Sequence, residues 1–352
     1  SPLPPFSPVK KSDSATSTRR GVIAGGNWIV DHVKLIDGWP AQDALANIIG
    51  QSHGNGGGPY NVLKNLARLG ATFPLAGVGR VGDDPDGRTI LDDCAAHRID
   101  ARGLRVTPGV ATSYTDVMTA ADTRRRTFFH CRGANARLAP DDFDFTGATA
   151  RYFYLGYILL LDTLDAPGSD GRPGAAAVLE RARAAGIRTA IDFVSAAADR
   201  FTGTARPLLP LVDVLFVNDY EAEQLTGLAL GRGEPLDRAA VRTAARRLLD
   251  AGVQDCVCLH FPEGAYLVRR EGSDHWQPSV RLPASAIAGT AGAGDAFASG
   301  VLYGLHEDWD LARAAELGVC AAAASLRHPT CSDAVVSADE CLALGRTYGF
   351  RA

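Results

Sequence analysis

The hydrophobic positions along the chain alternate between two periods from Gly21 onwards. Short apolar runs typical of buried strands are followed by longer stretches whose apolar residues recur at helical spacing. The predicted strands are Val22–Gly25, Phe73–Val78, Tyr152–Leu155, Arg188–Phe193, Asp213–Val217, Cys256–Leu259 and Tyr266–Arg269, and the predicted helices are Pro59–Leu69, Asp84–Ala96, Gly174–Ala185, Tyr220–Leu225, Leu236–Ala251, Gly292–Leu305 and Leu311–Leu326. This alternation favours an α/β fold, with a central, mostly parallel sheet and helices on both of its faces.

Two stretches, residues 28–50 and 107–132, interrupt this rhythm and have an extended pattern. Within the second, Thr112–Thr119 and Arg126–Cys131 flank a short polar segment and predict a hairpin. We expect both stretches to form a small β lid over the carboxyl ends of the main strands, where such sheets bind ligands. Residues 1–19 are rich in Pro, Ser and Lys and are predicted to be a disordered tail, which leaves one domain over residues 20–352.

Charge and composition weigh against several classes of partner. The net charge of -4 gives no support to binding of nucleic acid or of an anionic membrane surface. The longest apolar run, Tyr152–Leu161, is too short to span a bilayer, and no signal pattern is seen at the N-terminus, so a cytoplasmic location is expected. The 7 cysteines lack zinc-site spacing and are expected to be reduced and buried.

The segment Gly289–Gly300 carries the clearest chemical signal. Gly292, Ala293 and Gly294 lead into a predicted helix whose free N–H groups favour an anion, and glycine lets the backbone approach a phosphate closely. A carboxylate beside bound phosphate is repelled by it, unless the carboxylate takes a proton from an attacking hydroxyl. Asp295 therefore indicates phosphoryl transfer to an alcohol; the alternative is a strand-to-helix turn in which Asp295 only caps the helix.

Two nucleotide-binding patterns can be tested directly. Gly77–Gly82 matches the dinucleotide pattern GxGxxG. No acidic residue ends a following strand about twenty residues later, as that fingerprint requires, so NAD binding is not favoured. The chain contains no GxxxxGK[ST] sequence, which excludes P-loop chemistry.

Polar residues also follow other predicted strands. Asn27 and Asp31 follow the first strand, where Asp31 could accept bonds from two sugar hydroxyls or serve only as a turn residue. The segment His53–Asn61 packs four glycines before a helix, which indicates a tight ligand site or a flexible loop. Asn218 and Glu221 share one helical face, where Glu221 could hold Mg²⁺ through water or the pair could cap the helix.

Two further features stay open at this point. Arg124, Arg125 and Arg126 could grip the phosphate of an already phosphorylated sugar, whereas charges at a hairpin tip are usually solvated. Asp192 ends a predicted strand at the same edge as the other candidates, and its role is undetermined.

Four segments, in this order, resemble the PfkB (ribokinase-like) carbohydrate kinase family over about residues 20–345. Gly56–Asn61, with the Leu-Gly pair at 69–70, resembles the family's first signature, Gly-Gly-x-x-x-Asn…Leu-Gly. Gly79–Gly87 resembles its G-x-V-G-x-D-x-x-G segment, which accounts for the match to the dinucleotide pattern. Asn218 and Glu221 resemble its N-x-x-E motif, and Thr290–Phe297 resembles its second signature, T-x-G-A-G-D-x-F.

The resemblance implies a ribokinase-like fold and an enzyme that uses ATP and Mg²⁺. Asp295 would be the general base, and Gly292, Ala293 and Gly294 would form the anion hole. The sugar would contact Asn27, Asp31, Gly57, Gly58, Asn61, Arg132 and Asp295. The nucleotide would contact Asn218, Glu221, Gly264, Thr290, Gly292 and Gly294, with Glu221 also organising the metal.

The chain departs from the family pattern in three places. Gly289 stands where an Asp usually precedes the Thr, which is expected to alter the environment of the phosphate or of a monovalent cation. Gly58 stands where ribokinases carry a Lys, so ribose is not favoured. Cys258–Gly264 replaces the usual T-x-G-x-x-G nucleotide loop. None of these changes removes the base or the anion hole.

We therefore predict an ATP-dependent kinase that phosphorylates a hydroxymethyl group of a small-molecule sugar or sugar-like alcohol. One alternative is a nucleoside kinase of the adenosine type from the same family. Another is a catalytically silent ligand-binding relative, which the altered segment 260–264 motivates. A homodimer through the lid is also predicted, because exposed strand edges invite pairing.

Overall fold

The computed structural model describes residues 19–123, 125–231 and 236–351. Nearly all of the predicted tail, and Arg124 of the arginine run, lie outside the described residues. Arg19 was predicted as part of the tail, but its Nη1 donates to the carbonyl oxygens of Ala148 and Ala150 at 2.9 and 3.3 Å. Arg19 therefore belongs to the folded body.

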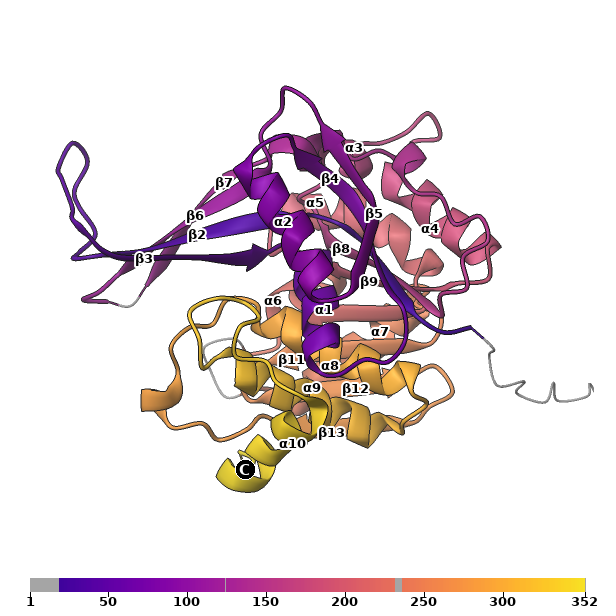
Figure 1. Cartoon of the computed structure of the whole chain (residues 1–352). Helices are drawn as coiled ribbons and strands as arrows, with labels where there is room; N and C mark the ends of the chain where they lie inside the picture. The colour runs from indigo at the N-terminus through magenta and orange to yellow at the C-terminus, as the bar shows by residue number, and fades with distance from the viewer. Residues whose placement is uncertain (1–18, 124, 232–235, 352) are drawn as a thin grey trace, which may run out of the picture.

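The main sheet has nine strands in the order β13-β12-β11-β10-β9-β8-β1-β4-β5 (Figure 1). Within this sheet, the seven strands β11, β10, β9, β8, β1, β4 and β5 pair in parallel. Strands β12 and β13 are added at the β11 edge and pair antiparallel. Their bounds are β1 Val22–Gly26, β4 Leu75–Gly82, β5 Ile99–Thr107, β8 Tyr152–Ile158, β9 Arg188–Phe193, β10 Val214–Asn218, β11 Cys256–Phe261, β12 Gly264–Arg269 and β13 Asp274–Pro278. The predicted mostly parallel sheet is confirmed, although β5 and β13 had no clear sequence signal.

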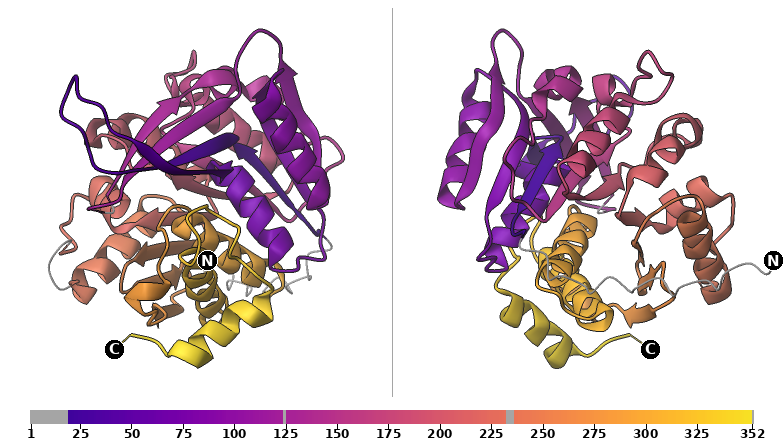
Figure 2. Two further views of the ribbon diagram at one scale, coloured as in Figure 1. Left: turned by 60° about the vertical axis from the view of Figure 1, so that its left-hand side comes forward. Right: turned by 90° about the vertical axis from the view of Figure 1, so that its right-hand side faces the viewer.

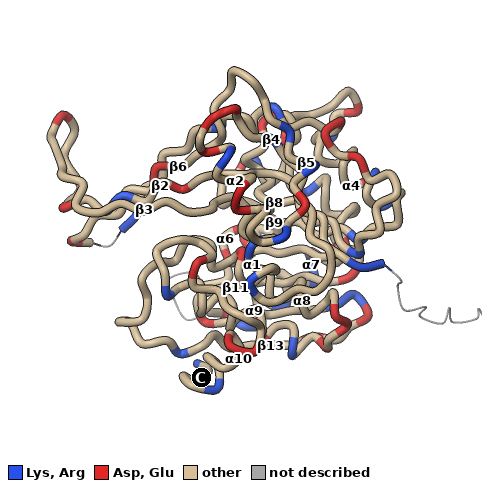
Figure 3. Tube along the Cα trace, viewed as in Figure 1, with Lys and Arg blue, Asp and Glu red and all other residues tan. Residues whose placement is uncertain are grey.

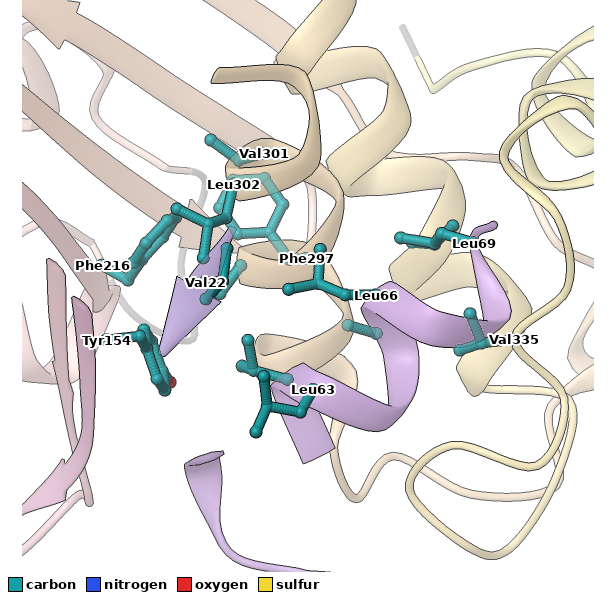
Figure 4. Close-up of a cluster of buried hydrophobic side chains, with 14 of the residues drawn as sticks. Val22, Leu63, Leu66, Leu69, Tyr154, Phe216, Phe297, Val301, Leu302 and Val335 are labelled. Atoms are coloured by element: carbon teal, nitrogen blue, oxygen red, sulfur yellow. The ribbon is translucent and has the colours of Figure 1, made fainter. Parts of the chain in front are cut away.

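Helices cover both faces of this sheet, as predicted. One face carries α1 (Gly58–Arg68), α2 (Pro85–Ala96), α8 (Ala293–His306), α9 (Leu311–Ser325) and α10 (Ala338–Tyr348), and the other carries α4 (Gly174–Ala184), α6 (Asp219–Thr226) and α7 (Arg238–Asp250), with short α3 (Asp162–Asp165) and α5 (Ala198–Arg200). Figure 4 shows Leu63 and Leu66 of α1 beside Phe297 of α8, with Val22 and Phe216 of the sheet. Strands covered on both sides are apolar along their length, which explains the short buried runs in the sequence.

A second sheet of four strands, in the order β3-β2-β6-β7, projects from the body as a lid (Figures 1 and 2). Its strands are β2 Ile29–Ile36, β3 Ile48–Gly56, β6 Ser113–Ala120 and β7 Arg126–Cys131. The predicted hairpin is present as β6 and β7. The glycine-rich loop is shorter than predicted, because β3 continues through residues 53–56 before α1 begins at Gly58.

The GxGxxG match at Gly77–Gly82 lies inside β4 and not in a phosphate-binding turn. The indole of Trp28 occupies the space above its glycines, and a β-carbon on Gly77 would come within 2.5 Å of the Trp28 ring. Trp28 Nε1 also donates to the carbonyl oxygen of Val78 at 3.0 Å. The glycines are therefore explained by packing, and the dinucleotide interpretation is wrong for this segment.

Charged residues of both signs are interspersed along the trace (Figure 3). This agrees with the small net charge of -4. Across the described ranges, no helix has both the length and the apolar character that a bilayer crossing requires.

Candidate active site

A cavity of about 500 Å³ lies where the carboxyl ends of the central strands, the N-terminus of α8 and the lid meet. A second cavity of about 410 Å³ adjoins it. The two cavities share five lining residues: Asn218, His260, Thr290, Ala293 and Gly294. They therefore meet at the turn before α8, where the sequence predicts phosphoryl transfer. We refer to them below as the acceptor cavity and the second cavity.

The turn before α8 presents backbone N–H groups to both cavities. Gly292 precedes the helix in the left-handed conformation, with φ 73° and ψ 3°, and no side chain caps the helix. A β-carbon on Gly292 would come within 2.5 Å of the Cys331 side chain, so this position requires glycine for space as well as for its dihedral angles. The first N–H groups of a helix lack partners within the helix and favour an anion, so the residues Gly292–Gly294 form a potential oxyanion site.

Asp295 lies in the first turn of α8 and is 4% exposed. Its Oδ2 accepts hydrogen bonds from Asn61 Nδ2 at 2.7 Å and from the Tyr157 hydroxyl at 2.9 Å. Burial raises the pKa of Asp295 to about 6, against the lowering effect of these two hydrogen bonds. Its Oδ1 accepts no hydrogen bond from the described residues, so this oxygen is available to take a proton. The alternative in which Asp295 only caps the helix does not fit these contacts.

The amide of Asn61 is oriented by a second asparagine that sequence reasoning missed. Asn55 Nδ2 donates to Asn61 Oδ1 at 2.6 Å and to the Ser332 hydroxyl at 2.8 Å. This turns the Asn61 amide so that its nitrogen faces Asp295. Asn55 is the penultimate residue of the lid strand β3, and Ser332 lies in the loop after α9. Three distant segments therefore converge on the position of the predicted base, which no local pattern could reveal.

Tyr157 and Asp192 complete the surroundings of Asp295. Asp192 accepts from the Tyr157 backbone N–H at 2.7 Å, and Tyr157 adopts a left-handed φ of 62°. Such a φ is uncommon for a bulky residue and marks a constrained position. The pKa of Asp192 is held well above its usual value, chiefly by burial and then by the charge of Asp295. Asp192 thus positions the tyrosine that contacts Asp295, which gives a structural role to a residue left open above.

The lid contributes a row of polar residues to the acceptor cavity. Asp31 of β2 pairs with Thr115 of β6, which pairs with His130 of β7, and all three line the cavity. Paired residues on neighbouring strands lie on the same face, so the row faces the body. Asp31 accepts from the Cys331 thiol at 3.6 Å, and burial raises the pKa of Asp31 to about 7.

We expect Asp31→Asn to stabilise the ligand-free protein at alkaline pH. The pKa of Asp31 is about 7 in the folded state against about 3.9 when unfolded, so the folded state binds this proton more tightly. Its stability contribution is therefore complete at acid pH and is lost as the pH rises towards 7. The variant should gain roughly 1–3 kcal/mol in urea unfolding at pH 8, and clearly less at pH 5. An equal change at both pH values would contradict this assignment.

Asn218 and Glu221 form a reciprocal helix cap and also line the acceptor cavity. Asn218 Oδ1 accepts from the Glu221 N–H at 2.8 Å, and the Glu221 carboxylate accepts from the Asn218 N–H at 3.0 Å and from the Ser195 hydroxyl at 3.0 Å. Burial raises the pKa of Glu221 to about 7. The capping interpretation is thus correct, and it leaves a ligand role possible because the cap faces the cavity.

The residues fit a magnesium ion that keeps its waters. No group of three or more His, Cys, Asp and Glu side chains within the described ranges could hold a metal by protein ligands alone. Mg²⁺ commonly binds through one or two carboxylates, retained waters and substrate phosphates. Glu221 is a buried carboxylate at such a place, next to the turn that would receive the phosphates.

The second cavity has a largely apolar wall. It is lined by Phe297 of α8, by side chains of α9 and by the segment after β13, including Val280, Leu282, Ile287, Val319 and Leu326. Gly264 also lines it, at the start of β12, after the turn at Pro262. His260 contacts both cavities, and burial lowers its pKa to about 4, so its ring is neutral at physiological pH. The altered segment thus leaves an open pocket of a size and character that suit a nucleobase.

The structure brings most of the predicted site residues together, with three exceptions. Asp31, Gly57, Asn218, Glu221, Thr290 and the residues Gly292–Asp295 line the acceptor cavity. The predicted substrate contacts Asn27, Gly58, Asn61 and Arg132 do not, although Asn61 still contacts Asp295, and the predicted nucleotide contact Gly264 lines the second cavity. The Asn27 amide donates to the Tyr157 carbonyl oxygen at 3.2 Å, Gly58 lies beneath Tyr157, and Arg132 pairs with Asp162 at 3.0 Å. Asn27, Gly58 and Arg132 are close in sequence to residues of the site, but their side chains or backbone make other contacts and do not line the cavity.

Comparisons with known proteins agree with this geometry. Residues 27–338 match the pfkB family of carbohydrate kinases. The chain is 26% identical over 308 residues to a probable chloroplastic fructokinase-6 of Arabidopsis thaliana, covering 85% of this chain and 74% of the relative. It is 27% identical over 296 residues to an ATP-dependent ribose-1-phosphate kinase of Halopiger xanaduensis, covering 84% and 88%.

Among solved structures, Arabidopsis thaliana ribokinase complexed with ribose and ATP superposes with a TM-score of 0.75 at 19% identity, over 93% of this chain and 99% of that one. This likeness establishes the ribokinase-like fold. The family match spans most of the chain and includes all four motifs. The chain therefore belongs to the pfkB family of ATP-dependent carbohydrate kinases.

Proposed function

We propose that this protein transfers the γ-phosphoryl group of ATP to a hydroxymethyl group of a sugar or sugar-like alcohol. The observation that carries the proposal is the placement of Asp295 and the N-terminus of α8 in one cavity. A base and an anion site within one helical turn serve the two reactants of a phosphoryl transfer. The lid row containing Asp31 provides hydrogen-bonding groups for the hydroxyls of the acceptor.

In the proposed reaction, Asp295 Oδ1 takes the proton of the acceptor hydroxyl while the hydroxyl oxygen attacks the γ-phosphorus. The bond between the γ-phosphorus and the bridging oxygen breaks in line, and ADP leaves with that electron pair. The backbone N–H groups of Gly292–Gly294 stabilise negative charge on the transferred oxygens. Asp295, which now holds the proton, returns it to solvent after the phosphorylated product leaves.

We propose that the second cavity holds the base of ATP, because its apolar wall suits an aromatic ring. The phosphates would then lie along Asn218 and Thr290 towards the turn before α8. When bound, Mg²⁺ would neutralise the phosphate charge, with Glu221 as its protein contact through water. The similar structure of a putative ribokinase II from E. coli is a complex with ATP and Mg²⁺, which supports this pair of ligands.

The direct test is an ATP-consumption assay with Mg²⁺ against a panel of hexoses, pentoses, ketoses, sugar acids, phosphosugars and nucleosides. We expect at least one sugar or sugar-like alcohol to give consumption that disappears in an Asp295→Ala variant. No acceptor-dependent consumption from any member of the panel, with ATP binding also absent in calorimetry, would reject the proposal and favour a silent ligand-binding protein.

A nucleoside acceptor is the second candidate function. Phe128, Leu160 and Phe193 line the acceptor cavity together with its polar residues. Such apolar side chains would contact a base attached to the sugar. Preferential turnover of nucleosides over free sugars in the same panel would select this candidate.

We also propose that the lid pairs with a second copy of the chain. Large apolar residues are exposed on it, including Trp39, Ile48, Ile49 and Phe129, which are 51–56% exposed, and the rings of Trp39 and Phe129 stack at 6.3 Å. β3 is an edge strand of the lid sheet, and exposed edges invite pairing. Light scattering should give the mass of a dimer, and Ile49→Lys should give a monomer. A monomeric mass for the wild type would reject this proposal.

A further inference from the structure

Arg126 begins the lid strand β7 and shares a face with residues that line the acceptor cavity. Side chains alternate between the faces of a strand, so Arg126, Phe128 and His130 lie on one face, and the last two line the cavity. The guanidinium reaches across to Gly289, because a β-carbon added to Gly289 would overlap Arg126 Nη2. Arg126 therefore lies over the residue that precedes Thr290 and the phosphoryl-transfer turn.

The charge of Arg126 lacks a counter-ion in the part of the chain that the structure describes. Its guanidinium makes neither a hydrogen bond nor an ion pair there, whereas the nearby Arg132 is paired with Asp162 at 3.0 Å. Arg126 is half-buried, and burial lowers its pKa against the attraction of Cys331 and Asp31. A guanidinium taken from water without a partner is costly, and its parallel N–H groups bind a carboxylate or a phosphate in bidentate fashion.

The surroundings of Arg126 place its missing partner on the acceptor and not on ATP. The groups that interact with it electrostatically, Asp31 and Cys331, both line the acceptor cavity. Glu221, which faces the phosphates in the proposed function, is not among them. The lid thus brings a positive charge close to Asp31 and Cys331, which line the acceptor cavity.

We infer that the acceptor carries an anionic group, either a carboxylate or a phosphate ester, and that Arg126 of the lid binds it beside Gly289. The inference rests on the proposed kinase function and specifies its substrate class. It also gives Arg126, one of the three consecutive arginines, a role in substrate binding, whereas charged residues at a hairpin tip are usually only solvated. The same chemistry recognises a sugar acid and a sugar phosphate, so the experiment must separate the two.

The test uses the full chain and acceptors matched in carbon skeleton. Glucitol, gluconate and the glucitol phosphates form one set. Free sugars and the corresponding sugar 1-phosphates form further sets. We expect anionic members to have lower KM values than their neutral partners, and Arg126→Gln to raise KM for the anionic members alone by roughly 10- to 100-fold. The KM for ATP should stay within about twofold, and Arg126→Lys should restore part of the affinity.

Arg125→Gln is the matched control, because Arg125 is exposed and adjacent in sequence, and it should leave all KM values unchanged. Preference for acids or for phosphates identifies the source of the anion, and either supports the inference. If neutral acceptors are turned over, and this turnover requires Asp295 but does not change in Arg126→Gln, the kinase proposal is retained and the inference about an anionic acceptor is overturned. A rise in KM for ATP with Arg126→Gln would also overturn it. No turnover of any acceptor, with ATP binding also absent in calorimetry, would overturn the kinase proposal with it.

Discussion

Replacing Asp295 with Asn should lower kcat by about 10³- to 10⁴-fold, the range expected when a general base is removed. Asparagine has nearly the same shape and can still accept from Asn61 and from the Tyr157 hydroxyl, so the fold and the acceptor affinity should change little. What disappears is the oxygen that takes the proton. Steady-state kinetics should therefore show the loss in kcat, and calorimetry should show acceptor binding within about threefold of the wild type.

The pH dependence tests the same assignment without removing the base. Because the pKa of Asp295 is raised to about 6 and those of Asp31 and Glu221 to about 7, kcat/KM of the wild type should be constant above about pH 7 and fall at least tenfold per pH unit below pH 6. Tyr157→Phe removes a hydrogen bond that lowers the pKa of Asp295, so its acidic limb should move to higher pH, with activity at pH 8 largely retained. Activity of Asp295→Asn within tenfold of the wild type would exclude Asp295 as the base.

Replacing Gly292 with Ala should lower kcat by roughly 10²- to 10³-fold, the cost of disturbing an oxyanion site. The new methyl group would enter the space of Cys331, and the left-handed φ of 73° is unfavourable for alanine. The turn must shift, so its N–H groups no longer point at the transferred oxygens. Affinity for the acceptor should be less affected, because its proposed contacts lie mainly on the lid.

Gly227→Ala provides a matched control for this variant. Gly227 ends α6 with φ 70° and ψ 17°, almost the same backbone conformation, but a β-carbon there would meet no atom within 4 Å. It should cost about 1 kcal/mol of stability through backbone strain and leave kcat unchanged. If both variants lowered kcat equally, the loss at Gly292 would reflect general strain and not the oxyanion site.

The layered fold could be predicted from the sequence because its signals are local. Apolar runs in β1, β8, β9, β10 and β11 were recognisable, since parallel strands covered on both faces must be apolar throughout. Strand β5 escaped prediction because it is an edge strand in which the exposed residues Arg102, Arg105 and Val106 break up the apolar positions. The glycines of β4 were misleading, because the indole that requires them comes from Trp28, far away in the sequence.

The parts of the site that are continuous in the chain could be predicted before the fold was known. A helix N-terminus, its glycine turn and a carboxylate within its first turn, as at Gly292–Asp295, follow from the order of residues, because their geometry depends only on the local backbone. The same is true of Asn218 and Glu221, which both cap α6 and face the cavity.

Which distant residues meet depends on the packing of the whole fold. This packing brought Asn55, Tyr157 and Asp192 around the base, placed Arg126 over Gly289, and directed Arg132 to Asp162. Arg126 and Arg132 are similar lid arginines in the sequence. Their surroundings differ because the residues that each side chain contacts depend on how the lid lies over the body. That arrangement is set by packing between elements that are far apart in the sequence, so no local pattern contains it.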